Sequence, residues 1–446
     1  MSQTSVPRLS APRLLAALLL VLTAVSAGTQ IASAQAIPAS GRFSLYTGWS
    51  EREAADGETS DLTEVIASLS LEPPSGWDSL FEYALDARFA TYPSSERDQT
   101  VSIYEAYVGL HSRDQRWSAR LGQLWVRELG GLGSVGGVHG EYRLANATSV
   151  GSWRFGLFAG LEPEFYEGGF ADDVRKGGVY AALDGARGRR HVLGFVTIRN
   201  SDLTERSVVV FNNYVPVART FNMYQGLEYD TQGPGDLGGS DLTYFFINLR
   251  YSPARVFDIQ GTYHRGRSID TRTITRDQLD GRPVAPEALE GLLFESGRVR
   301  LTFRATRFVS LWASVGQDRN DWDDDAHDRF QLGVSARQLF DTGFDVTVSS
   351  SQYSDGDDSY DSLYASIGTA VGPKVYLSLD YSESFAVYHY EDGNGGTIEV
   401  RPDSSRYALS CNLNLNRTFS FLLVAETADS DDFDEKRVLG GLVVRF

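Results

Sequence analysis

The residues of this sequence that could do chemistry are arginines and carboxylates set at even spacing. Arg298, Arg300 and Arg304 would share one face of an extended strand, because successive side chains of a strand point to opposite faces. The same alternation gives a wider charged set that we expect on one face of a sheet: Arg120, Arg143, Arg154, Arg250, Arg298, Arg300, Arg304, Glu82, Asp86, Arg88, Glu141 and Asp258. The planar fork of arginine holds two acceptors at once, so such a face could line a pore and select ions and polar solutes. An alternative of equal weight is that the arginines pair with the acids across strands and stiffen a wall.

Other chemical motifs in the sequence are incomplete. His327 and His389 lie in acidic segments, but no Ser, His and Asn order stands out beside them, so we expect no enzyme. The run at 355–358 is a fragment of a calcium loop without the downstream glutamate, and we expect no metal site there. The glycine-rich run from Gly130 to Gly137 has no Lys-Ser/Thr partner and predicts a flexible loop between strands. No cofactor is implied.

The elements that must position the charged face are long alternating segments. Apolar and polar residues alternate over 42–49, 81–89, 153–161, 298–304, 329–336 and 406–416. These segments approach the length of about ten residues that a tilted strand needs to cross a bilayer. A soluble sandwich also alternates, but its strands average about 5–6 residues. We therefore expect an all-β fold, a single transmembrane antiparallel up-and-down β-barrel.

The connections between these segments alternate between short turns and longer loops rich in acids. Polar loops are expected at 354–359, 389–404 and 428–435, and tight turns at 372–373 and 416–417. This rhythm is typical of outer-membrane barrels, which have short periplasmic turns and longer extracellular loops. It gives about 22 strands, within a range of about 18–24, and places both termini on the periplasmic side.

Two regions leave the pattern open. From Ala186 to Asp230 both faces of the strands are apolar, so the register is ambiguous. The longest expected loop, Arg267 to Ser296, contains a helical pattern from Pro286 to Phe294. That helix could fold into the lumen as a constriction or pack on the loop outside.

Composition and the chain start indicate an exported protein. Arg8 and Arg13 precede an apolar run and a small-residue cleavage site, which predicts a signal peptide over 1–34 and a mature barrel over 35–446. The formal net charge of −18 argues against a nucleic-acid partner. Cys411 is the only cysteine, so no internal disulfide is expected.

The last residues resemble the terminal strand of Gram-negative outer-membrane β-barrel proteins. Gly440, Leu442, Val444 and Phe446 match the final aromatic and the alternating residues before it, which in that family are the assembly signal read by the barrel-assembly machinery. The resemblance implies a cell outer-membrane location. It also implies outer-membrane lipid and lipopolysaccharide as surroundings.

Two functions remain open at this point. The first is a porin-like channel for passive diffusion of small hydrophilic solutes or ions. The second is a structural or interaction barrel that serves as a sleeve or surface scaffold for another envelope protein. The state of the lumen separates them, because a wide empty lumen would suggest a missing partner and a constricted one a selective pore.

Overall fold

The structure is a computed structural model that describes residues 39–446 except 76–78, 146–149, 165–167, 322–325, 340–341, 357 and 392–396. The expected signal peptide over 1–34 therefore lies outside the described residues. No helix in the described ranges is both long and apolar enough to cross a membrane.

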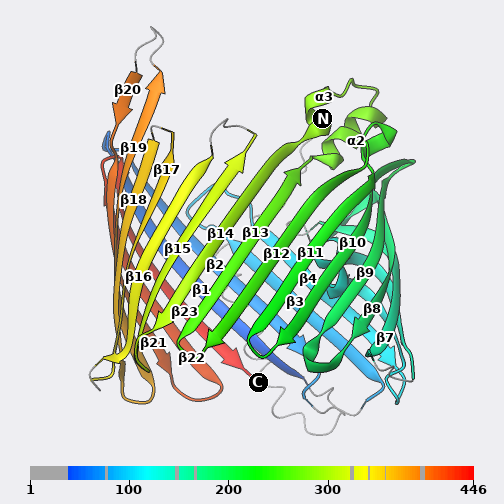
Figure 1. The fold of residues 1–446 in the computed structure, drawn as a ribbon, viewed down its shortest axis with the longest axis horizontal. Coiled ribbons are helices and arrows are strands. Elements are labelled where there is room, and N and C mark those ends of the chain that lie inside the picture. Colours follow the sequence, from blue (N-terminus) through cyan, green and yellow to red (C-terminus); the bar gives the residue numbers. More distant parts are fainter. Residues whose placement is uncertain are drawn as a thin grey trace.

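Antiparallel strands follow one another along nearly the whole described chain (Figure 1). They are β1 (Ser40–Ala54), β2 (Thr59–Glu72), β3 (Phe81–Thr91), β4 (Thr100–His111), β5 (Trp117–Trp125), β6 (Ser134–Arg143), β7 (Ser152–Glu164), β8 (Gly169–Asp184), β9 (Arg190–Asn200), β10 (Leu203–Ala218), β11 (Phe221–Gln232), β12 (Asp241–Ala254), β13 (Phe257–Ser268), β14 (Leu292–Arg304), β15 (Val309–Asn320), β16 (His327–Leu339), β17 (Phe344–Asp355), β18 (Asp358–Val371), β19 (Val375–Glu391), β20 (Thr397–Val400), β21 (Asp403–Asn414), β22 (Phe419–Ser430) and β23 (Phe433–Arg445). Apart from the short β20, each strand pairs with the next strand along the chain, which is the up-and-down topology that the alternation predicted.

The sheet closes on itself. β1 pairs with β2 on one side and with β23 on the other, where the Gly41 amide donates to the Phe446 carbonyl at 2.8 Å. The short strand β20 pairs only with the outer end of β19, while β19 goes on to pair with β21. In the described residues the wall is thus a closed antiparallel barrel of 22 strands, which confirms the predicted fold and leaves the wall without a free edge.

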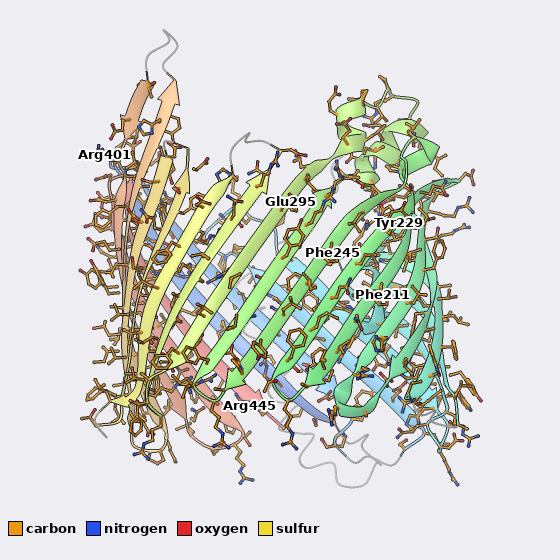
Figure 2. All side chains as sticks on the ribbon, viewed as in Figure 1. Phe211, Tyr229, Phe245, Glu295, Arg401 and Arg445 are labelled. Carbon is orange, nitrogen blue, oxygen red and sulfur yellow. The ribbon has the colours of Figure 1, made fainter. Side chains whose placement is uncertain are left out.

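One face of the wall is apolar and exposed. Leu121, Leu157 and Val315 on this face are each more than half exposed. In Figure 2, Phe211 and Phe245 lie across the front wall, and both belong to this apolar register. Rows of exposed apolar side chains around a closed sheet are stable in hydrocarbon and not in water, so this outer face is the lipid face.

One rim carries most of the larger features. The helices α2 (Thr271–Leu279) and α3 (Pro286–Glu290) stand there between β13 and β14 (Figure 1). The helix expected at Pro286 to Phe294 is therefore shorter than predicted, because its last apolar residues already belong to β14. α2 was not predicted; the Asp270 side chain caps its start by accepting from the Thr273 amide at 3.0 Å.

Two of the expected acidic loops are largely strand. β22 and β23 extend through the segment 428–435 and leave only Asp431 and Asp432 between them. β17 and β18 likewise reach into 354–359.

The connection between β5 and β6 folds into the barrel. It forms η1 (Arg127–Gly133), whose Leu129 is completely buried against the inner faces of β8, β9 and β10. A Cβ added to Gly194 would lie 2.2 Å from Leu129 Cδ2, so this glycine makes room for the leucine. The prediction of a flexible loop over Gly130 to Gly137 was wrong, since this stretch supplies η1 and the start of β6.

Around η1 lies the only large apolar cluster of buried side chains found among the described residues. Its members are Leu124, Val126, Leu129, Leu132, Val135, Phe158, Ala171, Val174, Tyr180, Ala182, Val192, Val196, Ile198, Val208 and Val210. The strand residues of β9 and β10 are apolar on both faces because one face meets lipid and the other meets η1. This explains the ambiguous register between Ala186 and Asp230.

Candidate pore lining

The inner face of the barrel carries the charged residues singled out from the sequence. Strand pairing places them in register with one another and opposite in parity to the apolar outer rows. This face also makes contacts that skip strands, such as the hydrogen bond from Arg298 on β14 to Gln331 on β16. Such contacts form readily on the concave side of a wall, so this face encloses the lumen.

Arg154 is a buried cation that contacts three carboxylates. Its Nη1 lies 2.6 Å from Glu141 Oε2 and 3.0 Å from Glu128 Oε1, and its Nε lies 2.5 Å from Asp184 Oδ2. Tyr180 donates to the same Glu141 oxygen at 2.7 Å. Glu128 belongs to η1, so this arginine ties the inserted segment to the wall.

Two further predicted pairs join strands of the wall, the first across β4 from β5 to β3 and the second between the adjacent β12 and β13. Arg120 Nε lies 2.8 Å from Glu82 Oε1, and Arg250 Nε lies 2.8 Å from Asp258 Oδ2. In both pairs the charges compensate each other, as the wall-stiffening interpretation expects. For Arg120, Arg154 and Arg250, that interpretation describes the contacts of the arginines well.

Arg298 and Arg300 are different. Arg298 Nη2 donates to Ser314 Oγ at 3.1 Å and to the Gln331 side chain, both of them neutral. The Arg300 guanidinium lies 4.4 Å from the centre of the Trp312 ring. Among the described residues neither arginine has a carboxylate within ion-pair distance, so this part of the lumen carries uncompensated positive charge.

The remaining predicted residues lie apart from these groups. Arg143 is the exposed last residue of β6, and Arg304 donates to the Arg255 carbonyl at 2.9 Å where β14 ends. Asp86 and Arg88 occupy the inner register of β3, half-buried and exposed respectively. The structure therefore divides the predicted set into paired, uncompensated and peripheral charges.

Sequence reasoning missed a second charge network near the loop rim. Arg206 contacts Asp230 at 2.7 Å and Glu228 at 3.0 Å. Arg272 of α2 lies 2.5 Å from Glu162 and 2.9 Å from Glu205. A β-bulge at 204–206 interrupts the alternation, and α2 has no strand parity, so the period-two pattern could not find these contacts.

The opposite side of the lumen is lined by small hydroxyl side chains, by tyrosines and by the carboxylates of Asp345 and Asp380, which accept from Tyr376 and Tyr364. Cross-strand serine pairs join β17 to β18 and β19 to β21, as in Ser378–Ser410 and Ser384–Ser404, each at 2.6 Å between oxygens. Within the described ranges no inserted segment packs on this side as η1 does on the other. The lumen is thus filled on one side and lined by short side chains on the other.

The terminal residues close the barrel. Gly440, Leu442 and Val444 lie in the outward register of β23 and pair with both β1 and β22. Phe446 follows the strand and is about half exposed. Its ring lies close to Gly41, where an added Cβ would be 3.2 Å from Phe446 Cε2.

Two histidine–carboxylate pairs lie beyond these networks, one between β16 and β17 and one between β18 and β19. His327 Nδ1 lies 2.7 Å from Asp355, and His389 Nδ1 lies 3.0 Å from Asp358. In the part of the chain that the structure describes, no group of three or more His, Cys, Asp or Glu side chains is placed to hold a metal ion.

A closed antiparallel barrel with an apolar outside and a charged inside defines a transmembrane β-barrel of the outer-membrane type. Comparison with known proteins finds solved structures of bacterial origin. Pseudomonas aeruginosa OpdQ matches over 92% of this chain and 99% of its own, with 10% identity and a TM-score of 0.43. Pseudomonas aeruginosa OccK11 (OpdR) covers 92% and 96% at 10% identity and a TM-score of 0.40, and Acinetobacter baumannii OccAB4 covers 92% and 99% at 11% identity and a TM-score of 0.40.

No protein-family description matches the sequence, and no curated protein matches it. The class of this protein therefore rests on its own closed sheet and on the chemistry of its two faces.

Proposed function

We propose that this protein is a porin-like channel for passive diffusion of small hydrophilic solutes or ions across the outer membrane. The observation that carries the proposal is the uneven lumen. One side is filled by η1 and its apolar cluster, and the other is lined by serines and by the uncompensated arginines Arg298 and Arg300. A lumen that is narrowed from one side and wet on the other suits a selective pore.

The charge of the proposed path favours anions over cations. Arg298 and Arg300 have only neutral or aromatic partners among the described residues, so their positive potential acts on a passing solute. The paired arginines contribute less, because carboxylates such as Glu82 neutralise them locally. Asp345 and Asp380 bring negative charge to the opposite side of the lumen, so we assign the anion preference to the path along Arg298 and Arg300.

The sleeve alternative receives less support from the lumen. A barrel that encloses a partner protein needs an unobstructed inside, whereas η1 occupies part of this one with a fully buried leucine. The insertion is not the segment that the sequence suggested, since α2 and α3 stand at the rim (Figure 1). The inserted segment still supports the selective-pore function.

The residues at the end of β23 support a proposed interaction with the barrel-assembly machinery. Leu442 and Val444 face lipid on the closing strand, and Phe446 ends the chain with an exposed aromatic ring. An exposed aromatic ring at the end of the closing strand is accessible to an assembly machinery. We therefore retain Gly440, Leu442, Val444 and Phe446 as the proposed assembly signal.

Swelling of proteoliposomes in small solutes tests the channel and its charge preference together. The wild-type protein should admit small neutral and anionic solutes, and R298S with R300S should slow the anionic solute several-fold more than the neutral one. R143S with R304S, which removes two exposed arginines at the strand ends, should leave this ratio near its wild-type value. Swelling equal to that of protein-free liposomes would contradict the channel.

A further inference from the structure

A connected group of aromatic rings lies on the inner wall of β11 to β14. We call this group the aromatic strip; its members are Tyr224, Tyr244, Phe246, His264 and Phe294. Neighbouring ring centres are 5.8 Å apart for Tyr224 and Phe246, 5.4 Å for Tyr244 and His264, and 6.4 Å for His264 and Phe294. Phe246 and His264 complete the chain of contacts at 6.4 Å.

Strand register places the strip inside the barrel. Phe294 has the same parity on β14 as Arg298, whose guanidinium reaches across the concave face to Gln331. The alternate residues Phe245 and Tyr263 face outward and contact each other at 6.0 Å. Phe245 can be seen on the front wall in Figure 2. The two aromatic sets thus lie on opposite sides of the same strands.

Glycines let the rings of the strip lie along the wall. A Cβ on Gly266 would approach the Phe294 ring to 3.0 Å, and one on Gly226 would approach Tyr244 to 3.3 Å. Covering a strand glycine with a ring can stabilise a sheet by itself. Covering glycines does not explain why these rings stay exposed, since Tyr224 is 42% exposed and Phe294 is 40% exposed. Apolar rings that face a wet lumen are available to a solute.

The strip leads from one mouth toward the narrowed part of the lumen. Phe294 stands near the start of β14, just after α3, whereas Tyr224 lies in the first part of β11, toward the opposite end of the barrel. Tyr224 also lines a cavity of about 140 Å³ beside η1 together with Arg190 and Asn212. The strip therefore connects the mouth with the constriction.

Polar groups accompany the rings on the same face. Asn248 pairs with Thr262 in the register, and Thr262 pairs with Arg298. Arg298 and its neighbour Arg300 lack a carboxylate partner among the described residues. A solute on the strip would thus meet aromatic faces, neutral hydrogen-bonding groups and two guanidinium groups whose partners are neutral or aromatic.

We propose that the aromatic strip binds acidic saccharides, meaning short chains of sugar rings that carry carboxylates; this inference rests on the proposed channel function. Sugar rings present C–H faces that pack on aromatic rings, and hydroxyls that bond to amides and hydroxyls. A single small aromatic acid would cover only part of five connected rings, whereas a chain of sugar units follows them. Arg298 and Arg300 supply the bidentate partners for carboxylates.

Current interruption in planar bilayers tests the proposal with trigalacturonate, maltotriose and benzoate as probes. Trigalacturonate should interrupt the current at the lowest concentration, and maltotriose should do so only at a higher concentration. Benzoate should not interrupt the current at either of these concentrations. Y224A with F246A should weaken the trigalacturonate effect by roughly tenfold, as expected for the loss of stacking worth about 1.4 kcal/mol. F245A, the outward neighbour on β12, should leave it unchanged. R298Q with R300Q should abolish the preference for the acidic sugar.

The outcomes separate the strip from the channel. Normal steps in plain salt without interruption by either sugar would overturn the strip and leave the channel intact. Interruption by benzoate at the same concentration as trigalacturonate would overturn the saccharide assignment. If plain salt gives no steps, titration calorimetry of the detergent-solubilised protein with trigalacturonate decides the point: heat that Y224A with F246A removes would support the strip, and its absence would overturn it.

Discussion

Arg154 shows how the barrel keeps charge inside its wall. It is buried, and three carboxylates surround it, one of them on the inserted segment η1. A buried charge is costly unless it is paired and hydrogen-bonded, and this arginine is satisfied on every side. Arg298 and Arg300 show the opposite arrangement, because no described carboxylate balances them. Arginines on one side of the lumen thus stabilise the barrel wall through ion pairs, whereas arginines on the other side line the proposed solute path.

Replacing Arg154 with methionine should destabilise the barrel strongly. Glu128, Glu141 and Asp184 would keep their charges without the shared cation, and loss of one partner from a buried pair costs about 3–5 kcal/mol. Denaturant unfolding in lipid vesicles measures the change. The matched change R143M, at the exposed end of β6, should stay within about 0.5 kcal/mol of wild type. Equal losses for the two variants would contradict the network.

At the scale of elements, η1 explains a pattern that the sequence left ambiguous. A β strand with one lipid face and one wet face alternates, but β9 and β10 are apolar on both faces because η1 covers the inner one. Gly194 leaves space for Leu129, and Asn212 Nδ2 donates to the Glu128 carbonyl at 2.8 Å. The position of η1 therefore depends on the residues of β9 and β10, and the apolar inner faces of these strands depend on η1.

The cap of α2 gives an element-scale prediction of pH dependence. Hydrogen bonds from Thr273 hold the pKa of the Asp270 carboxyl below its ordinary value of 3.8. A depressed carboxyl pKa stabilises the capped helix above the unfolded pKa, and this stability is lost as pH falls through the folded pKa. Protection of α2 amides from hydrogen exchange should therefore persist through mild acid and fall only below about pH 4.

Two variants isolate the contribution of this cap. D270A should lower the local stability of α2 by about 0.5–2 kcal/mol at neutral pH. D270N keeps a capping oxygen that does not titrate, so it should retain protection at neutral pH and lose the acid-dependent part of the change. An acid response of D270N equal to that of the wild type would show that another group is responsible.

For the whole molecule, alternation along the sequence predicted the closed barrel, and the rhythm of short turns and longer loops predicted about 22 strands. Parity also placed Arg120, Glu82 and Arg298 correctly on one face, because no bulge interrupts their strands at those positions. It could not find contacts that depend on non-strand elements. Glu128 belongs to η1 and Arg272 to α2, and the glycines around η1 resemble those of an ordinary loop. The sequence also could not show which arginines form ion pairs with carboxylates. Arg120, which forms one, and Arg298, which does not, have similar alternating patterns around them.

Single-channel conductance tests the central claim most directly, which is that η1 narrows a lumen that stays open. The wild-type protein should give discrete current steps that grow with salt concentration. A variant in which residues 127–132 are replaced by a glycine-serine linker should give larger steps, because the segment that fills one side of the lumen is gone. Wild-type protein that inserts without any current steps, or a linker variant whose steps equal those of the wild type, would contradict the account.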